Sequence, residues 1–302
     1  MLKLQNYALI IIVMTTVSAQ LNSANANPLR CENLFANYKV QQFEINIKGK
    51  SQAKQYLEVA FENLSIESQT ESAEVLLLQI SQEGTLSLSD EQKKFITHFR
   101  QNSSYMRSVF QTSSLKHRSP KDFANFVRDF GHLKDMILIN ESEKAKRMSS
   151  RILAKYDFID FKKILKNVKP ATRKSTTKYF KSIVKSTNRI LAQPYVTVDE
   201  LHDVRKNLRD ILRYLQIQNE VGHLIHEKSE KTYQLGQDDS IHDTPEILFL
   251  KKTNRQLGKI CDENAGLIIQ GQLFEDTVIE FPEKLKTRVQ YIIQNLQIQD
   301  NQ

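Results

Sequence analysis

The stretch Thr197–Ile217, TVDELHDVRKNLRDILRYLQI, decides how the rest of the chain is interpreted. It opens with two candidate N-cap residues, Thr197 and Asp199, and continues with apolar residues at helical spacing. At about 100° per residue, one side of this helix carries residues suited to a core: Val204, Leu208, Ile211 and Leu215, with Leu212 at the border. The stretch therefore predicts an amphipathic helix.

The opposite side of the same helix is basic. Five residues that carry or accept positive charge fall within roughly 100° of one another: His202, Arg205, Lys206, Arg209 and Arg213. Like charges three and four residues apart repel one another by about 0.2–0.5 kcal/mol per pair, and Asp203 and Asp210 lie to the side of this row. The row is either a solvated surface or a binding site for a polyanion.

The pattern Leu201-His202-x-x-Arg205-Lys206-x-x-Arg209-x-x-x-Arg213-Tyr214 resembles the signature helix of the CHAD domain, the conserved histidine α-helical domain. A second segment, Leu250-Lys251-Lys252 through Leu257-Gly258-x-x-x-Asp262, is similar to a later helix of that family. The resemblance covers residues 197–302. It implies a helical bundle of two four-helix halves, whose basic helices line a cavity that binds inorganic polyphosphate. Carried over to this chain, the implied binding residues are His202, Arg205, Lys206, Arg209 and Arg213.

A second basic row precedes this helix. The segment Thr172–Leu191 is expected to be helical, and its cations lie within roughly 80° of one another: Lys174, Lys178, Lys181, Lys185 and Arg189. Gln193-Pro194-Tyr195 then turns the chain into the next helix, and short connections make sequential helices antiparallel neighbours. We therefore expect the two rows to face one common groove, and we include the second row among the polyphosphate-binding residues.

Composition and charge agree with a helical protein that has an anionic partner. Only 8 Gly and 6 Pro occur in 302 residues, which favours long helices over a turn-rich β fold. The net charge of +8 is concentrated, because residues 144–213 hold 19 Lys and Arg against 6 Asp and Glu. A concentrated basic block indicates a specific anionic partner rather than diffuse charge.

Residues 1–26 are typical of a secretory signal peptide. Lys3 supplies the positive end, Ala8–Val17 the apolar run, and Ala24-Asn25-Ala26 the cleavage site, with cleavage after Ala19 as the alternative. The run is short for a membrane span, although an uncleaved anchor is the other interpretation. We expect a secreted or periplasmic protein without a transmembrane span after cleavage.

The two cysteines and the histidines indicate no metal site. In an oxidising compartment Cys31 and Cys261 are either joined by a disulfide or present as two free thiols. No Cys and His residues have the spacing of a zinc site. We expect neither a metal nor another cofactor.

We predict a mainly α fold with three parts: a signal peptide (1–26), a small α/β or helical N-terminal extension (27–88), and a CHAD-like helical bundle of two four-helix halves (89–302). In the extension, residues 43–48 alternate as a half-buried strand does, and Ser51–Leu64 is expected to be helical. Glu74–Ser89 is either a strand that turns at Gly84 or a helix that ends there. Beyond it, helices are expected at 90–113, 121–140, 142–156, 157–168, 172–191, 245–264 and 282–297, and a surface loop at 227–244.

Residues 121–140 offer one candidate for the first-half counterpart of the signature helix. The run Val127-Arg128-Asp129-Phe130-x-His132-Leu133-Lys134 is similar to it in part, with Arg128 as the best match. The alternative is a helix unrelated to the signature, because the other arginines of the pattern are missing here.

The function predicted from these features is non-catalytic binding of inorganic polyphosphate or a similar polyanion in a basic groove between helices. The sequence contains no nucleophile motif, no phosphate-binding Gly loop and no convincing carboxylate pair, so no motif in it indicates an enzyme. One alternative is a protein that binds nucleic acid or an anionic surface. Another is a degenerate triphosphate phosphatase, since Glu44-x-Asn46-x-Lys48 is similar to the ExExK strand of CYTH phosphatases, with Asn in place of the middle Glu. A plain amphipathic strand is the simpler interpretation of that run.

Overall fold

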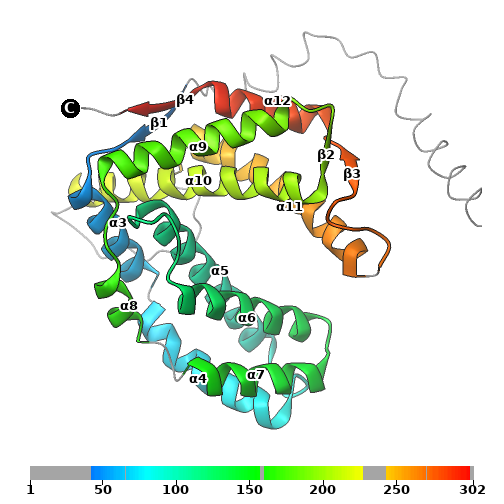
Figure 1. The fold of residues 1–302 in the computed structure, drawn as a ribbon. Helices are drawn as coiled ribbons and strands as arrows, with labels where there is room; N and C mark the ends of the chain where they lie inside the picture. The colour runs from blue at the N-terminus through cyan, green and yellow to red at the C-terminus, as the bar shows by residue number, and fades with distance from the viewer. Residues whose placement is uncertain (1–41, 65, 157–159, 227–242, 270, 300–302) are drawn as a thin grey trace, which may run out of the picture. The chain divides into compact units, whose positions relative to one another are not determined.

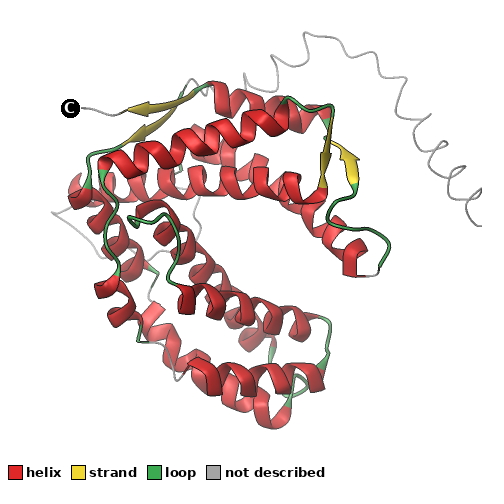
Figure 2. Cartoon of the chain, in the orientation of Figure 1, coloured by secondary structure: helices red, strands yellow, loops and turns green. Residues whose placement is uncertain are grey.

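The protein is built mainly from α-helices, as the scarcity of Gly and Pro predicts (Figures 1 and 2). The computed structural model describes residues 42–64, 66–156, 160–226, 243–269 and 271–299, and these contain ten helices and four short strands. All of them belong to one compact unit, residues 41–302.

Helix α10 (Val198–His226) lies at the centre of this unit. It begins as its sequence predicts: Glu200 N–H donates to Thr197 Oγ1 at 3.1 Å, and Thr197 N–H donates to Glu200 Oε2 at 3.1 Å. This reciprocal pair satisfies donors that the first helical turn leaves free. The predicted core residues are confirmed, since each is at most 6% exposed: Val204, Leu208, Ile211, Leu212 and Leu215.

Four helices pack against α10: α3 (Lys50–Asn63), α5 (Asp90–Ser113), α9 (Arg173–Leu191) and α11 (Pro245–Ile269). Aromatic rings in edge-to-face contact connect α10 with α9 and α3. The ring centroid of Tyr214 lies 4.9 Å from that of Phe180 and 5.4 Å from that of Tyr56. Such contacts add to the free energy of burial. Helix α12 (Glu283–Gln294) completes this region by packing on α9 and α11.

The remaining helices surround α5. Helices α4 (Ile66–Glu83) and α6 (Lys121–Leu138) each contact α5, and both contact α7 (Ser142–Tyr156). Their core is aromatic: the Phe99 ring contacts Phe130 at 5.1 Å and Phe126 at 6.1 Å. The short helix α8 (Phe161–Asn167) leads into α9.

Two pairs of short strands join distant parts of the chain. Strand β1 (Phe43–Asn46) runs parallel to β4 (Leu296–Gln299), and β2 (Tyr195–Thr197) runs antiparallel to β3 (Val278–Glu280). The strand predicted at residues 43–48 is confirmed over Phe43–Asn46. Of the two interpretations of residues 74–89, the helix is correct: α4 ends at Glu83, and Gly84 follows with φ of 84°, a conformation that suits glycine.

The contacts do not set residues 43–88 apart from the rest. Strand β1 pairs with β4, and α3 and α4 pack on α5. A boundary near residue 88 therefore separates no folding unit among the described residues.

Several predictions fall on residues that the structure does not describe. These are the signal peptide, Cys31 with its disulfide, and most of the loop at 227–244. Cys261 itself is buried. In the described segments no helix has both the length and the apolar character needed to cross a membrane.

Candidate functional site

The basic row of α10 is partly exposed and electrostatically connected. The side chains of Arg205 and Arg209 are each 31% exposed, and Lys206 is 42% exposed. Partial burial and the positive charges of Lys206, Arg205 and Arg209 lower the pKa of His202. The row therefore presents its charges together, as the helical spacing predicts. Lys206 also forms an ion pair with Asp203 at 3.0 Å, so this acid neutralises part of the row.

Arg205 rests on helix α11. Its Nη1 donates to Asp262 Oδ1 at 3.0 Å, and its guanidinium lies against Gly258, where a Cβ atom would come within 3.2 Å of Nη2. Glycine at this position leaves room for the arginine. The Leu257-Gly258-x-x-x-Asp262 segment thus positions the basic row.

Helix α5 brings two further arginines to the row, and sequence analysis missed both. Burial lowers the pKa of Arg107, and the positive charge of Arg209 lowers it further. Burial likewise lowers the pKa of Arg100, with contributions from Arg107 and Arg209. Arg128 of α6 also lowers the pKa of Arg107. We call Arg100, Arg107, Arg128 and Arg209 the arginine cluster.

Asp210 is the buried counter-charge of Arg209. Asp210 is 2% exposed, and its Oδ1 lies 3.8 Å from Arg209 Nε. Tyr179 Oη of α9 donates to the other carboxylate oxygen at 2.6 Å. Burial raises the pKa of Asp210, while Arg209 and Arg107 oppose that rise. Asp129 is also buried and lies 3.3 Å from Arg128 Nε, and Asp135 acts on Arg100. Arg107 and Arg209 therefore share Asp210 between them, which leaves positive charge at the junction of α5 and α10.

Arg100 rests on α6 in the way that Arg205 rests on α11. A Cβ atom at Gly131 would come within 2.9 Å of Arg100 Nε, and the charge of Asp135 raises the pKa of Arg100 against the effect of burial. The two supporting helices share one sequence pattern: Arg128-x-Phe130-Gly131-x-x-x-Asp135 in α6 and Arg255-x-Leu257-Gly258-x-x-x-Asp262 in α11.

This pattern favours the alternative interpretation of residues 121–140, a helix that is not the counterpart of the signature helix. Helix α6 lies beside α5 as α11 lies beside α10, so α6 corresponds to α11. The helix that corresponds to α10 is α5. The sequence comparison failed because α5 shares only one cation of the pattern with α10, Arg100 at the place of Arg205.

Arg213 lies at the end of the row where α5 crosses α10. Its guanidinium carbon is 4.6 Å from the centre of the Tyr105 ring, and Nη1 donates to Gln216 Oε1 at 2.6 Å. A cation over an aromatic face is attracted by the ring. Arg213 therefore joins α10 to α5 at this end.

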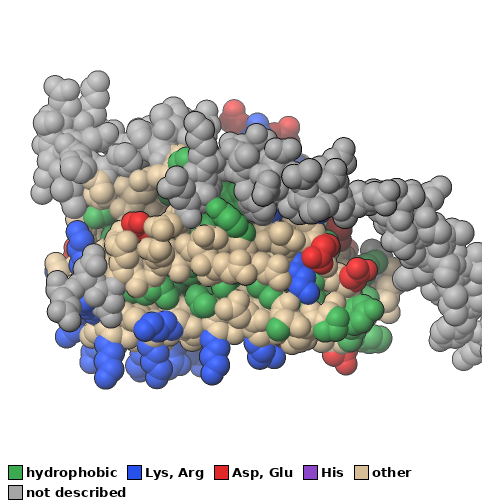
Figure 3. Space-filling model, turned by 90° about the horizontal axis from the view of Figure 1, so that it is seen from above, with side chains coloured by type: hydrophobic (Ala, Val, Ile, Leu, Met, Phe, Trp, Pro, Cys, Tyr) green, Lys and Arg blue, Asp and Glu red, His purple; other side chains and the backbone are tan. Residues whose placement is uncertain are grey.

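The second basic row lies on another face. All five of its residues, Lys174, Lys178, Lys181, Lys185 and Arg189, are exposed. Helix α9 contacts α10 through Tyr179, Phe180 and Thr187, which lie more than about 100° from the lysines around the helix. Figure 3 shows Lys and Arg side chains projecting in a row from the edge along which α9 runs.

The expectation that both rows face one groove is therefore wrong. Helix α9 packs on α10 through the side opposite its lysines, so the two rows point in different directions. Only Arg189 reaches toward α10, with Nη1 at 3.5 Å from Glu200 Oε1.

Comparison with family models, with curated proteins and with solved structures finds no match to this chain. Over the residues that the structure describes, no group of three His, Cys, Asp or Glu side chains is placed to hold a metal ion. The chemistry of the site therefore has to be inferred from its arginines.

Proposed function

We propose that this protein binds inorganic polyphosphate or a similar polyanion through the arginine cluster and the basic row of α10. Binding is non-catalytic, and the residues that contact the ligand include His202, Arg205, Lys206 and Arg209. The observation that carries the proposal is the convergence of Arg100 and Arg107 of α5 with Arg209 of α10.

Gathering like charges costs free energy in the unliganded protein. Burial is the main cause of the lowered pKa values of Arg100 and Arg107, and the neighbouring arginines lower both further, while Asp135 and Asp210 oppose the effect. A bound polyanion offsets the repulsion and satisfies the guanidinium donors, and arginine can donate two parallel hydrogen bonds to phosphate oxygens. The cluster is therefore better suited to phosphate than to a neutral ligand.

The CHAD resemblance supports polyphosphate in particular. Helices α4–α7 make the same neighbour contacts as helices α9–α12: first with second, second with third, third with fourth, and first with fourth. We infer that these are the two four-helix halves that the resemblance implies, with α5 and α10 meeting between them. The cluster would then lie in the cavity where members of that family bind polyphosphate.

A titration with labelled polyphosphate tests the proposal. Affinity should fall steeply between ~50 and ~200 mM salt, because each neutralised phosphate releases counterions. The variant Arg205→Gln/Arg209→Gln should bind at least about tenfold more weakly. A DNA oligonucleotide with the same number of phosphates should bind less tightly than polyphosphate.

The outer row of α9 provides the matched control. The variant Lys178→Gln/Lys181→Gln removes the same charge from exposed positions that do not contact α10. If it weakens binding as much as the arginine variant does, the cluster is not the site. Equal affinity for DNA and polyphosphate would instead support the alternative function, general binding of nucleic acid or anionic surfaces.

We also propose that the protein is exported to the periplasm or secreted, on the strength of residues 1–26. The mass of the protein purified from its native cells tests this. Cleavage after Ala26 or Ala19 is the expected result, and an intact N-terminus recovered from the cytoplasm would contradict it.

A further inference from the structure

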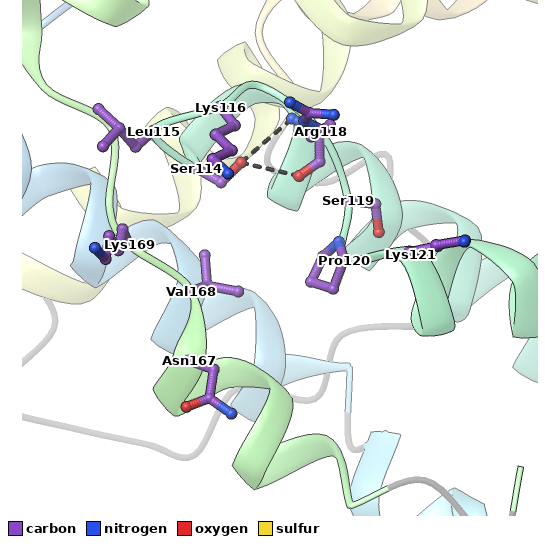
Figure 4. Close-up of a pocket in the computed structure, with 10 residues that line it drawn as sticks. All are labelled: Ser114, Leu115, Lys116, Arg118, Ser119, Pro120, Lys121, Asn167, Val168 and Lys169. Carbon is purple, nitrogen blue, oxygen red and sulfur yellow. Dashed lines mark hydrogen bonds between the residues drawn. The ribbon is translucent and has the colours of Figure 1, made fainter.

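A cavity of about 440 Å³ lies between the loop that joins α5 to α6 and the segment that joins α8 to α9 (Figure 4). No residue of the arginine cluster or of the α10 row lines it. Its volume is in the range of small-molecule sites. The ten residues around it are Ser114, Leu115, Lys116, Arg118, Ser119, Pro120, Lys121, Asn167, Val168 and Lys169.

The walls of this cavity are held in place by main-chain hydrogen bonds. Leu115 N–H donates to the Lys169 carbonyl at 2.8 Å, and Ala171 N–H donates to the Ser113 carbonyl at 2.8 Å. Ser114 Oγ donates to the Arg118 carbonyl and accepts from the Arg118 N–H, which closes the loop on itself (Figure 4). The cavity is therefore formed before any ligand arrives.

The charged residues that line the cavity are all cations: Lys116, Arg118, Lys121 and Lys169. All four are exposed, and none forms an ion pair with another described residue. Asp122 follows Lys121 on the first turn of α6 but does not line the cavity. Residues 161–198, which include one wall, contain ten Lys and Arg and no acidic residue. An anionic ligand would meet no carboxylate in this lining.

The start of helix α6 also favours an anion here. Helix α6 begins at the cavity with Pro120 as its N-cap, and no side chain caps its first turn. The N-terminus of a helix carries a partial positive charge that attracts phosphate groups.

Part of the lining is apolar. Leu115, Pro120 and Val168 contribute to the wall between the basic side chains (Figure 4), and Leu115 is 38% exposed. Inorganic phosphate would leave this surface in contact with water. A ligand that joins a phosphate group to an apolar or aromatic portion would cover it.

We propose that this cavity is a second binding site and that it takes a small organic phosphate. The phosphate lies among Lys116, Arg118, Lys121 and Lys169 near the start of α6, and the apolar portion lies against Leu115 and Val168. This site is independent of the proposed polyphosphate site.

Calorimetric titrations with ATP, tripolyphosphate and adenosine test the proposal without added metal. In the Arg205→Gln/Arg209→Gln variant, whose polyphosphate site is weakened, ATP should bind more tightly than tripolyphosphate does, and adenosine should bind least tightly. The variant Lys121→Gln/Lys169→Gln should weaken ATP binding by about tenfold or more, because two charged contacts to phosphate are lost.

Two controls separate this site from the rest of the molecule. The variant Lys174→Gln/Lys178→Gln removes the same charge from the outer face of α9 and should change the ATP affinity by less than about twofold. The variant Arg205→Gln/Arg209→Gln should leave ATP binding intact while weakening polyphosphate binding.

Three results would overturn the proposal. If the α9 control weakens ATP binding as much as the cavity variant, binding is diffuse. If only the arginine variant abolishes ATP binding, ATP occupies the arginine cluster instead. If tripolyphosphate binds the Arg205→Gln/Arg209→Gln variant as tightly as ATP does, the apolar wall does not contribute, and the ligand is not an organic phosphate.

Discussion

The α5–α6 pair and the α10–α11 pair both place an arginine against a glycine, but they provide it with different partners. In each pair a glycine lies under the arginine and an aspartate follows four residues later: Gly131 and Asp135 under Arg100, Gly258 and Asp262 under Arg205. Burial lowers the pKa of Arg100, whereas Arg205 is 31% exposed and forms an ion pair at 3.0 Å. Both arginines are half-buried, but Arg205 pairs directly with Asp262, whereas Asp135 forms its ion pair with Lys134 at 2.9 Å.

The two pairs also differ in how the supporting helix is joined to the next one. In α6 the residue after Arg128 is Asp129, whose Oδ2 accepts from Tyr156 Oη at 2.6 Å and from Lys155 Nζ at 2.9 Å on α7. In α11 the residue after Arg255 is Gln256, whose Oε1 accepts from Arg288 Nη1 on α12 at 2.6 Å. The acceptor is thus a carboxylate in the first pair and a neutral amide in the second. Only the hydrogen bonds of the first pair should therefore weaken at low pH.

The largest expected effect comes from Asp129→Asn. Burial alone would raise the pKa of Asp129, but hydrogen bonds from Tyr156, Lys155 and Arg128 lower it from 3.8 to about 2. A lowered carboxyl pKa contributes stability above the ordinary pKa, which is lost as the pH falls from about 4 to about 2. The variant should lose about 2 kcal/mol of unfolding free energy at pH 7, as measured by urea denaturation.

At pH 3 the difference between this variant and the unmodified protein should shrink, because the carboxyl of the unfolded chain is largely protonated there while the native carboxyl is still mostly ionised. Asp122→Asn, at an exposed position of the same helix, is the control and should have little effect at either pH. A loss that is equal at both pH values would mean that the charge of Asp129 contributes nothing.

The variants Gly131→Ala and Gly258→Ala should differ from each other by about 1–2 kcal/mol in their free energies of unfolding. Replacing a helical glycine by alanine stabilises a helix by about 1 kcal/mol when space is available. At Gly258 the new Cβ meets Arg205 Nη2 at 3.2 Å, and this tip of a partly exposed side chain can move. At Gly131 it meets the buried Arg100 Nε at 2.9 Å, so the side chain has to leave its position.

Thermal denaturation measures the outcome. Gly258→Ala should leave the midpoint unchanged or raise it, and Gly131→Ala should lower it. Equal shifts in the two variants would show that Arg100 is as free to move as Arg205.

A smaller effect, on polyphosphate affinity, is expected at the position three residues before Arg100 and Arg205. This position holds Thr97 in α5 and His202 in α10. Partial burial and the neighbouring cations lower the pKa of His202 in the free protein, so it is mostly neutral at pH 7. A bound polyanion favours the protonated form and raises this pKa. Polyphosphate affinity should therefore rise by about two- to fivefold as the pH falls from ~7.5 to ~5.5.

The variant His202→Gln should remove most of this pH dependence while it changes affinity at pH 7.5 little. Thr97→Val in the corresponding position of α5 should leave the dependence as it is. A His202→Gln protein with an unaltered pH profile would assign the effect to another group.

The smallest effect should come from Asp262→Asn. Asp262 is 74% exposed, and exposed ion pairs are worth about 0.2–1 kcal/mol and are screened by salt. Asp135→Asn should cost slightly more, since Asp135 offsets the charge of Arg100, whose Nε is buried. Urea denaturation at low and high salt compares them, and the two variants should become alike in high salt. A larger loss for Asp262→Asn would show that the burial of Arg100 does not strengthen its interaction with Asp135.

Local periodicity predicted most of the helices from the sequence. Leu201, Val204, Leu208 and Ile211 repeat with a helical period, and all are fully buried. Residues 75–80 were ambiguous because Val75 and Leu78, although apolar, face solvent beside the buried Leu76, Leu77 and Ile80. Packing of α4 on α7 selected the helix, and a single segment carries no information about that contact.

Relationships between distant segments account for the features that were missed. Arg100 and Arg107 are seven residues apart on α5 and form no long basic row, so their importance appears only when α10 supplies Arg209. The direction of the α9 lysines was also a matter of tertiary structure. Short connections place α9 beside α10 but do not fix which face of α9 turns inward. The strand at Tyr195–Thr197 was missed because its partner β3 begins at Val278.

The pairing of β1 with β4 has a consequence for biosynthesis. Phe43 aligns with Leu296 and Asn46 with Gln299, so the first described strand has to wait for more than 250 residues to be synthesised before its partner exists. Until then its edge is open to pairing with other chains. A ribosome that stops before codon 296 would release a chain with this edge uncovered, and such a product should be recognised by chaperones and proteases sooner than the finished protein.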